Sequence, residues 1–182
     1  MISYPVQTIE SAPEGAKPAI EQLQQAFGFV PNLIGALSNS PVLLNALVGV
    51  FQRVHGGNLS EAEIQIVLLT NAVTNSCPWA VAFHTALALQ QGVERADVQA
   101  IRQRRLPENP RYAALSRLAR TLIDKRGHLK NEDLTTFIEA GFKSELVLEM
   151  IAVVAASTIT NYGGTITNPP LEAAFQEHAW QP

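Results

Sequence analysis

Long apolar segments with helical spacing constrain the fold of this chain most strongly. The run from Ile64 to Val73 is apolar on nearly all sides, which is typical of a buried helix, and residues 143–164 have the pattern of a second, longer one. No convincing alternation of apolar and polar residues indicates a strand, and no Asn-Gly or Asp-Gly pair indicates a hairpin. The sequence therefore predicts an all-α fold.

Helix start and stop signals divide the chain into segments. Ser60 with Glu63 three residues later forms a capping box, and Asn131 is a favourable N-cap. We expect one domain over residues 1–182 with its core at about 41–165, built from about eight to ten helices. The segments read as helical are 13–28, 31–40, 41–57, 58–76, 76–92, 94–105, 110–127, 131–141, 143–164 and 171–180.

Composition excludes several classes of function. The formal net charge is −3, and the basic run at residues 102–105 is too short to indicate nucleic-acid binding. Hydrophobic residues make up 47% of the chain and charged residues 16%, a pattern that favours burial of apolar surface against another copy. We therefore expect a homo-oligomer that binds no nucleic acid.

Neither the N-terminal residues nor the longest apolar region indicates a membrane protein. The N-terminal residues lack a basic start followed by an apolar run, so no signal peptide is expected. The longest apolar region carries Glu149 and is too short to span a bilayer. One cysteine cannot form a disulfide within the chain, so a cytoplasmic location is the default expectation.

The single cysteine, Cys77, stands at the start of an expected helix. Pro78 is favoured at the first helical position, which places Cys77 at the positive end of the helix. Free N–H groups there stabilise a thiolate and favour reactivity. The alternative is that a lone cysteine is a small buried hydrophobic residue.

A histidine follows Cys77 on the same helix face. His84 lies seven residues later, which corresponds to a rise of about 10 Å, too far for a direct hydrogen bond. Position 80 is one turn from His84, but it is an alanine. Trp79 points elsewhere and is expected to be a packing residue. Without further support, His84 would be read as a satisfied, partly buried histidine.

Three segments in order resemble one protein family. Residues 28–47, 59–92 and 159–180 are similar to the pre-core segment, core motif and C-terminal tail of the alkylhydroperoxidase D-like, peroxidase-related branch of the carboxymuconolactone decarboxylase superfamily. The resemblance implies an alkylhydroperoxidase D-like helical bundle that forms homo-oligomers. It also implies a redox motif made of Glu, eleven residues, Cys-x-x-Cys, three residues and His.

This chain keeps two of the four groups of that motif. The first Cys corresponds to Cys77 and the His to His84, whereas the second Cys falls on Ala80 and the Glu on Gln65. In the family the Glu completes a proton relay, and Gln65 cannot accept a proton as a carboxylate does. Glu61, one turn earlier on the same face, could take its place.

Three hypotheses follow from the altered motif. The first is a single-cysteine thiol peroxidase, in which Cys77 attacks a hydroperoxide, His84 and Gln65 position the substrate, and an external thiol reduces the product. The second is a lyase or isomerase that uses His84 as acid–base group on a cyclic acid. The third is a binding or scaffold protein without catalysis. The histidines and the cysteine lack metal-ligand spacing, and nucleotide-binding glycine motifs are absent, so no cofactor is expected.

Two further regions are read as helix ends. His55 is expected to interact with the terminus of its own helix. Asn161 and Tyr162 could reach the cavity expected beside His84, but a role in ending the helix, with Gly163 or Gly164 as C-cap, is favoured.

Overall fold

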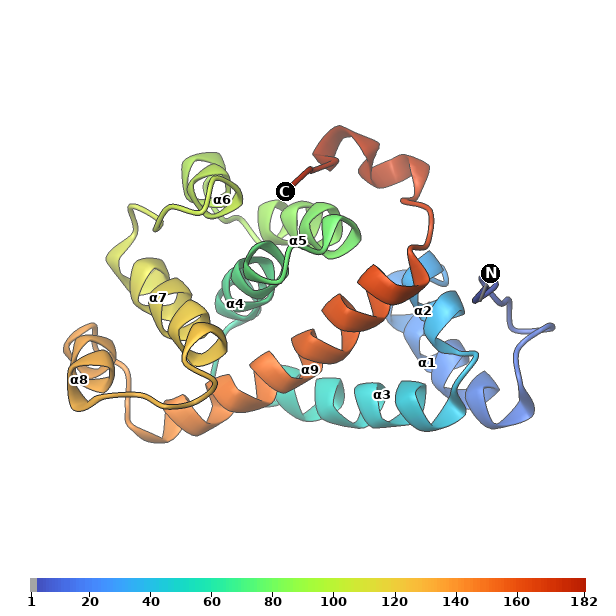
Figure 1. The fold of residues 1–182 in the computed structure, drawn as a ribbon, viewed down its shortest axis with the longest axis horizontal. Coiled ribbons are helices and arrows are strands. Elements are labelled where there is room, and N and C mark those ends of the chain that lie inside the picture. Colours follow the sequence, from blue (N-terminus) through green and yellow to red (C-terminus); the bar gives the residue numbers. More distant parts are fainter. Residues whose placement is uncertain (1–2) are drawn as a thin grey trace.

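The computed structural model describes residues 3–182, and this part of the chain is helical without strands, which confirms the predicted fold class. Figure 1 shows the helices around the long diagonal helix α9. The elements are η1 Glu14–Ala16, α1 Lys17–Phe27, α2 Asn32–Leu37, α3 Pro41–His55, α4 Glu61–Thr74, α5 Pro78–Gln90, α6 Arg95–Arg102, α7 Pro110–Asp124, α8 Asn131–Glu139, α9 Glu145–Thr167 and η2 Ala173–His178.

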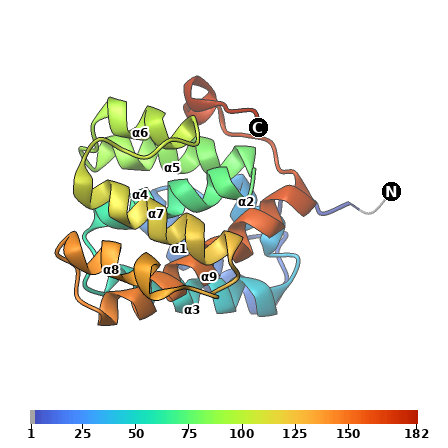
Figure 2. The ribbon, with the colours of Figure 1, turned by 60° about the vertical axis from the view of Figure 1, so that its left-hand side comes forward.

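Helix α4 forms the centre of the core. All its residues from Glu63 to Val73 are buried, as the apolar pattern predicts. It packs against α5 on one side and against α7 and α9 on the others. Figure 2 shows α5 and α6 at one end of the molecule and α3 and α8 at the opposite end, with α4 and α7 between them. Gln65 and Leu68 are two of these buried residues, and their positions are fixed by the packing of α4 on several sides.

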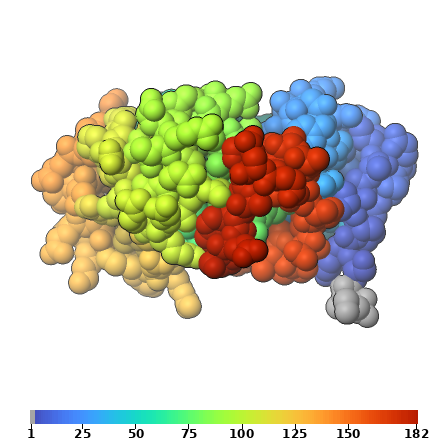
Figure 3. All heavy atoms as spheres, turned by 90° about the horizontal axis from the view of Figure 1, so that it is seen from above, coloured from blue at the N-terminus to red at the C-terminus, as the bar shows by residue number. Residues whose placement is uncertain are grey.

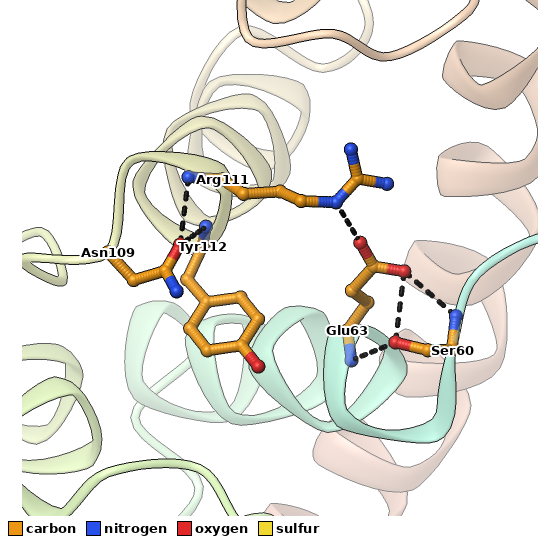
Figure 4. A network of polar contacts seen from close by, with 5 residues as sticks. All are labelled: Ser60, Glu63, Asn109, Arg111 and Tyr112. Atoms are coloured by element: carbon orange, nitrogen blue, oxygen red, sulfur yellow. Dashed lines mark hydrogen bonds and ion pairs between the residues drawn. The ribbon is translucent and has the colours of Figure 1, made fainter.

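The start of α4 is fixed by the predicted capping box. Ser60 accepts a hydrogen bond from the backbone N–H of Glu63, and Glu63 accepts one from the backbone N–H of Ser60. Arg111 on α7 donates to the same carboxylate at 2.5 Å, and Asn109 caps α7 beside it (Figure 4). Burial alone would raise the pKa of Glu63, but the hydrogen bonds from Ser60 and Arg111 outweigh it and lower the pKa. The network thus joins the first turns of α4 and α7.

The end of α9 lies further along the chain than predicted. The helix continues through Gly163 and Gly164 to Thr167, and Asn168 in the left-handed conformation ends it. The glycines serve close packing instead of termination. A Cβ on Gly163 would collide with the side chain of Leu37, and one on Gly164 would lie 2.9 Å from Sγ of Cys77.

One face of α9 stays open to solvent. Leu148, Ile151, Tyr162 and Ile166 are exposed along it, so the expected fully buried helix is buried on only part of its circumference. By length and composition alone α9 could cross a membrane, but it packs against α2, α3, α4, α5 and α7 as a core helix does. An apolar face of this kind is compatible with self-association, which stays a prediction.

The C-terminal segment returns to the start of the fold. Figure 3 shows it on the surface between the middle of the chain and the N-terminal helices. One oxygen of Glu172 accepts from the backbone N–H of Asn32 at 2.6 Å, and the other accepts from Nε1 of Trp79 at 3.0 Å. This carboxylate joins α2 to α5 and fixes the indole ring described next.

Candidate functional site

A cavity of about 270 Å³ lies between α1, α3 and α5 and reaches α2, α4 and α9. Its wall is mostly apolar, and its polar side chains come from three glutamines, two histidines and a threonine. Among the described residues, the wall consists of Gln22, Leu23, Ala26, Phe27, Pro31, Leu33, Ile34, Leu47, Val48, Phe51, Gln52, His55, Gln65, Leu68, Trp79, Phe83, His84, Leu87 and Thr160.

An aromatic group forms the α5 side of this wall. The rings of Trp79 and Phe83 stack with their centroids 4.8 Å apart, and Phe27 contacts Phe83 edge-on at 5.5 Å. Phe175 from the C-terminal segment supports Phe83 from another side at 5.3 Å. Trp79 is therefore a packing residue, as expected, but it also lines the cavity.

The most buried polar side chains of the wall include a pair formed by His84 and Gln65. Nδ1 of His84 lies 3.0 Å from Oε1 of Gln65, and both side chains are about 5% exposed. Because an amide oxygen only accepts, Nδ1 carries the proton and Nε2 keeps its lone pair. Burial, with a smaller contribution from the charge of His55, lowers the pKa of His84 to about 3. The imidazole is thus neutral and can accept a hydrogen bond.

Cys77 lies outside the cavity wall among the described residues. Its side chain is 0% exposed, and the backbone of Gly164 packs against the sulfur. Burial raises the pKa of the thiol, and smaller effects of the N–H groups of Ala80 and Trp79 and of Thr165 act in the opposite direction. The helix N-terminus therefore does not activate this thiol against its desolvation.

The three predicted site residues, Cys77, His84 and Gln65, do not all lie together. The structure brings His84 and Gln65 into direct contact and places Cys77 apart from them, at the closed end of α5. Asn161 is fully buried away from the cavity wall, and Tyr162 is 57% exposed, so among this group only the neighbouring Thr160 reaches the cavity.

Within residues 3–182, no three His, Cys, Asp or Glu side chains are grouped to hold a metal ion.

A second histidine in the wall was missed by sequence reasoning. His55, in the last turn of α3, stacks on Phe51 and directs Nδ1 at the carboxylate of Glu61, 2.8 Å away. Glu61 therefore binds His55 and does not replace Gln65 beside His84. The sequence signal was slight: a histidine and a glutamate on either side of the short turn between two helices.

Comparisons with known proteins bear on the family and the fold. The model of the carboxymuconolactone decarboxylase family matches residues 41–121, a range that holds His55, Glu61, Gln65, Cys77 and His84. A comparison with curated proteins found no match.

Solved structures of the same fold extend over nearly the whole chain. One is an alkylhydroperoxidase AhpD core from Ralstonia eutropha, an uncharacterized peroxidase-related protein, with 20% identity over 94% of this chain and 93% of that one and a TM-score of 0.82. Another is the debrominase Bmp8, with 19% identity, 96% and 94% coverage and a TM-score of 0.77. A third is a cysteine-to-alanine variant of Bmp8 in complex with 2,3,4-tribromopyrrole, with 19% identity, 98% and 95% coverage and a TM-score of 0.76. At these identities the likeness establishes the fold.

Proposed function

Because residues 41–121 match the carboxymuconolactone decarboxylase family and the fold is that of an alkylhydroperoxidase D core, we propose that this chain is a member of that family and binds a small uncharged organic molecule beside His84. The observation that carries the proposal is a cavity of about 270 Å³ with a buried imidazole–amide pair in an apolar wall. Small-molecule sites usually combine a largely apolar pocket with a few placed polar groups.

The wall selects against a charged ligand. Among the described residues it contains no Asp, Glu, Lys or Arg, so a carboxylate in its buried part beside His84 would lose its water without gaining a permanently charged cationic partner. The cyclic acid expected for a lyase therefore fits poorly in its ionised form. A neutral molecule that donates one N–H or O–H to Nε2 of His84 satisfies the imidazole and buries its remaining surface against Trp79 and Phe83.

One of the similar structures supports this class of ligand. The Bmp8 variant binds 2,3,4-tribromopyrrole, a small aromatic ring that carries an N–H group. Phenols and nitrogen heterocycles have the same combination of a flat apolar surface and one donor. An alkyl hydroperoxide is also uncharged and has an O–H donor, so it remains within the proposed class.

Binding of 4-nitrophenol, measured by titration calorimetry at mildly acidic pH where the probe is neutral, tests the proposal. We expect saturable binding, with affinity about tenfold lower in His84→Phe, which keeps the ring volume but loses the acceptor. His128→Gln, in an exposed loop, is the matched control and should bind as the unchanged protein does. Absence of binding, or equal binding of 4-nitrobenzoate, which carries a carboxylate, would contradict the proposal.

A single-cysteine peroxidase activity is the second candidate, favoured by the position of Cys77 at the N-terminus of α5. In that reaction the thiolate cleaves the O–O bond, a sulfenic acid forms, an alcohol leaves, and an external thiol reduces the sulfur. The complete burial of Cys77 and the raised pKa of its thiol weigh against it. We rank it below the binding proposal because His84, and not Cys77, lines the cavity.

A further inference from the structure

The two histidines in the cavity wall have opposite surroundings. His84 is 5% exposed and held by the neutral amide of Gln65, so a proton on Nε2 would create a buried charge without a counter-charge. The imidazole of His55 is open to water and held by the carboxylate of Glu61 at 2.8 Å. A carboxylate on Nδ1 fixes the tautomer and balances the charge that the ring gains when Nε2 accepts a proton.

We propose that His55, positioned by Glu61, exchanges a proton with the molecule bound in the cavity, and that His84 orients this molecule without being protonated. The inference rests on the proposed small-molecule site and assigns it acid–base chemistry. In the forward step an O–H, N–H or C–H bond of the ligand breaks, an N–H bond forms at Nε2 of His55, and the electron pair stays on the ligand. The reverse step returns the proton, so no oxidant or reductant is needed.

The geometry divides these two tasks between the histidines. Among the described wall residues, His55 and His84 are the only ones with an imidazole, and the wall holds no Asp, Glu, Lys or Arg. The groups that face His55 are Glu61 from α4 and His84 from α5, while the wall residues from α1 are uncharged. The positive charge of His55 acts on His84 and disfavours a second proton there. A proton released by the bound molecule is therefore disfavoured on His84, and the exposed ring beside the Glu61 carboxylate is the better acceptor.

The position of His55 suits proton exchange. It lies in the last turn of α3, at the exposed side of the cavity, whereas His84 lies within α5 in the core. A proton can pass from the ring of His55 to water without entering the apolar interior. The simpler alternative is a surface ion pair that fastens the turn between α3 and α4, which would contribute at most about 1 kcal/mol to stability.

The ionisation of bound 4-nitrophenol separates these possibilities, since its phenolate absorbs visible light and its phenol does not. We expect the ratio of bound phenolate to bound phenol in the unchanged protein to exceed that in His55→Gln by about tenfold at equal pH, because the nearby imidazolium favours the anion. Glu61→Gln should lower the ratio by a smaller factor. His128→Gln should leave it unchanged. Circular dichroism of each variant checks the fold, and Gln at position 55 can still bind Glu61.

The outcomes distinguish this inference from the function on which it rests. Normal binding in His55→Gln with an unchanged phenolate ratio would overturn the role of His55 and leave the binding site intact. Loss of the phenolate in His84→Phe at saturating probe, with no effect of His55→Gln, would assign the proton to His84 and overturn the division of tasks. Failure of the unchanged protein to bind the probe would overturn both proposals. A purely structural His55–Glu61 pair would change the stability of the protein but not the colour of the bound probe.

Discussion

Cys77 and His84 lie on the same helix, two turns apart, in surroundings that differ in almost every respect. The sulfur of Cys77 packs against Gly164 of α9, and Cys77 is not among the residues that line the cavity beside His84. His84 forms part of the cavity wall and keeps a ring nitrogen available for a ligand. The redox motif predicts a catalytic role for both residues. In the structure, packing against α9 encloses Cys77 at the start of α5, whereas the cavity between α1, α3 and α5 leaves His84 accessible to a ligand.

The comparison shows that the helices packed against α5 determine the protonation and the accessibility of its two candidate residues. Both residues are buried, but burial acts on them in opposite ways. It raises the pKa of Cys77 and lowers that of His84, so each is uncharged at neutral pH. A neutral thiol is a poor nucleophile, whereas a neutral imidazole is a good hydrogen-bond acceptor. The same desolvation therefore removes the function expected of Cys77 and supports the one proposed for His84.

The strongest way to break this comparison is to measure the reactivity of Cys77. We expect iodoacetamide to alkylate the native protein at least about 100-fold more slowly than the unfolded chain, because reaction requires a local opening of the α5–α9 contact. Cys77→Ser is the blank, since the chain has one cysteine. A fast native reaction with a half-maximal rate well below the ordinary thiol pKa of about 8.5 would restore the peroxidase hypothesis.

The dependence of stability on acid pH tests the burial of His84, the second residue of the comparison. Between pH 6.5 and the folded-state pKa of His84 of about 3, the unfolded chain binds a proton that the folded chain does not. Stability is therefore lost as the pH falls through this window, by about 2 kcal/mol from pH 6.5 to pH 5. His84→Gln cannot titrate and should lack this part of the slope in urea unfolding. Equal slopes in the two proteins would mean that His84 is accessible to protons.

The fold class and part of the candidate site could be predicted from the sequence. The helices and the capping box at Ser60 follow from local spacing, and the structure has them nearly as predicted. The resemblance aligned Gln65 with a residue that acts together with His84, and the two side chains lie 3.0 Å apart. Local patterns and a motif carried position by position are sufficient for such features.

Features that depend on packing between distant segments could not be predicted. The closure around Cys77 needs Gly164, which the sequence pattern assigned to a helix end. The pairing of His55 with Glu61 depends on the turn between α3 and α4, and the exposure of His55 to the cavity depends on how α1 lies across α3. Gly164 could either end a helix or allow close packing, and His55 could either serve a helix terminus or line a cavity. Which role each residue has depends on the neighbouring helix.

The smallest expected effect concerns the contact that separates Cys77 from His84. Gly164→Ala adds a Cβ at 2.9 Å from Sγ of Cys77 and 3.5 Å from a methyl group of Leu33. Overpacking of this kind costs about 1–3 kcal/mol, while Ala in a helix interior is favoured over Gly by about 1 kcal/mol. We therefore expect a net destabilisation of about 1 kcal/mol in urea unfolding.

Two matched variants show whether the sulfur is the cause. Gly49→Ala, in the interior of α3, meets nothing within 4 Å and should stabilise the protein by up to about 1 kcal/mol. Cys77→Ala removes the sulfur, so adding Gly164→Ala in that background should cost less than in the unchanged protein. If the cost of Gly164→Ala is the same in both backgrounds, the sulfur is not the limiting contact. The cost would then arise mainly at Leu33, the other side chain that the added Cβ contacts, and the sulfur would not be what closes this end of α5.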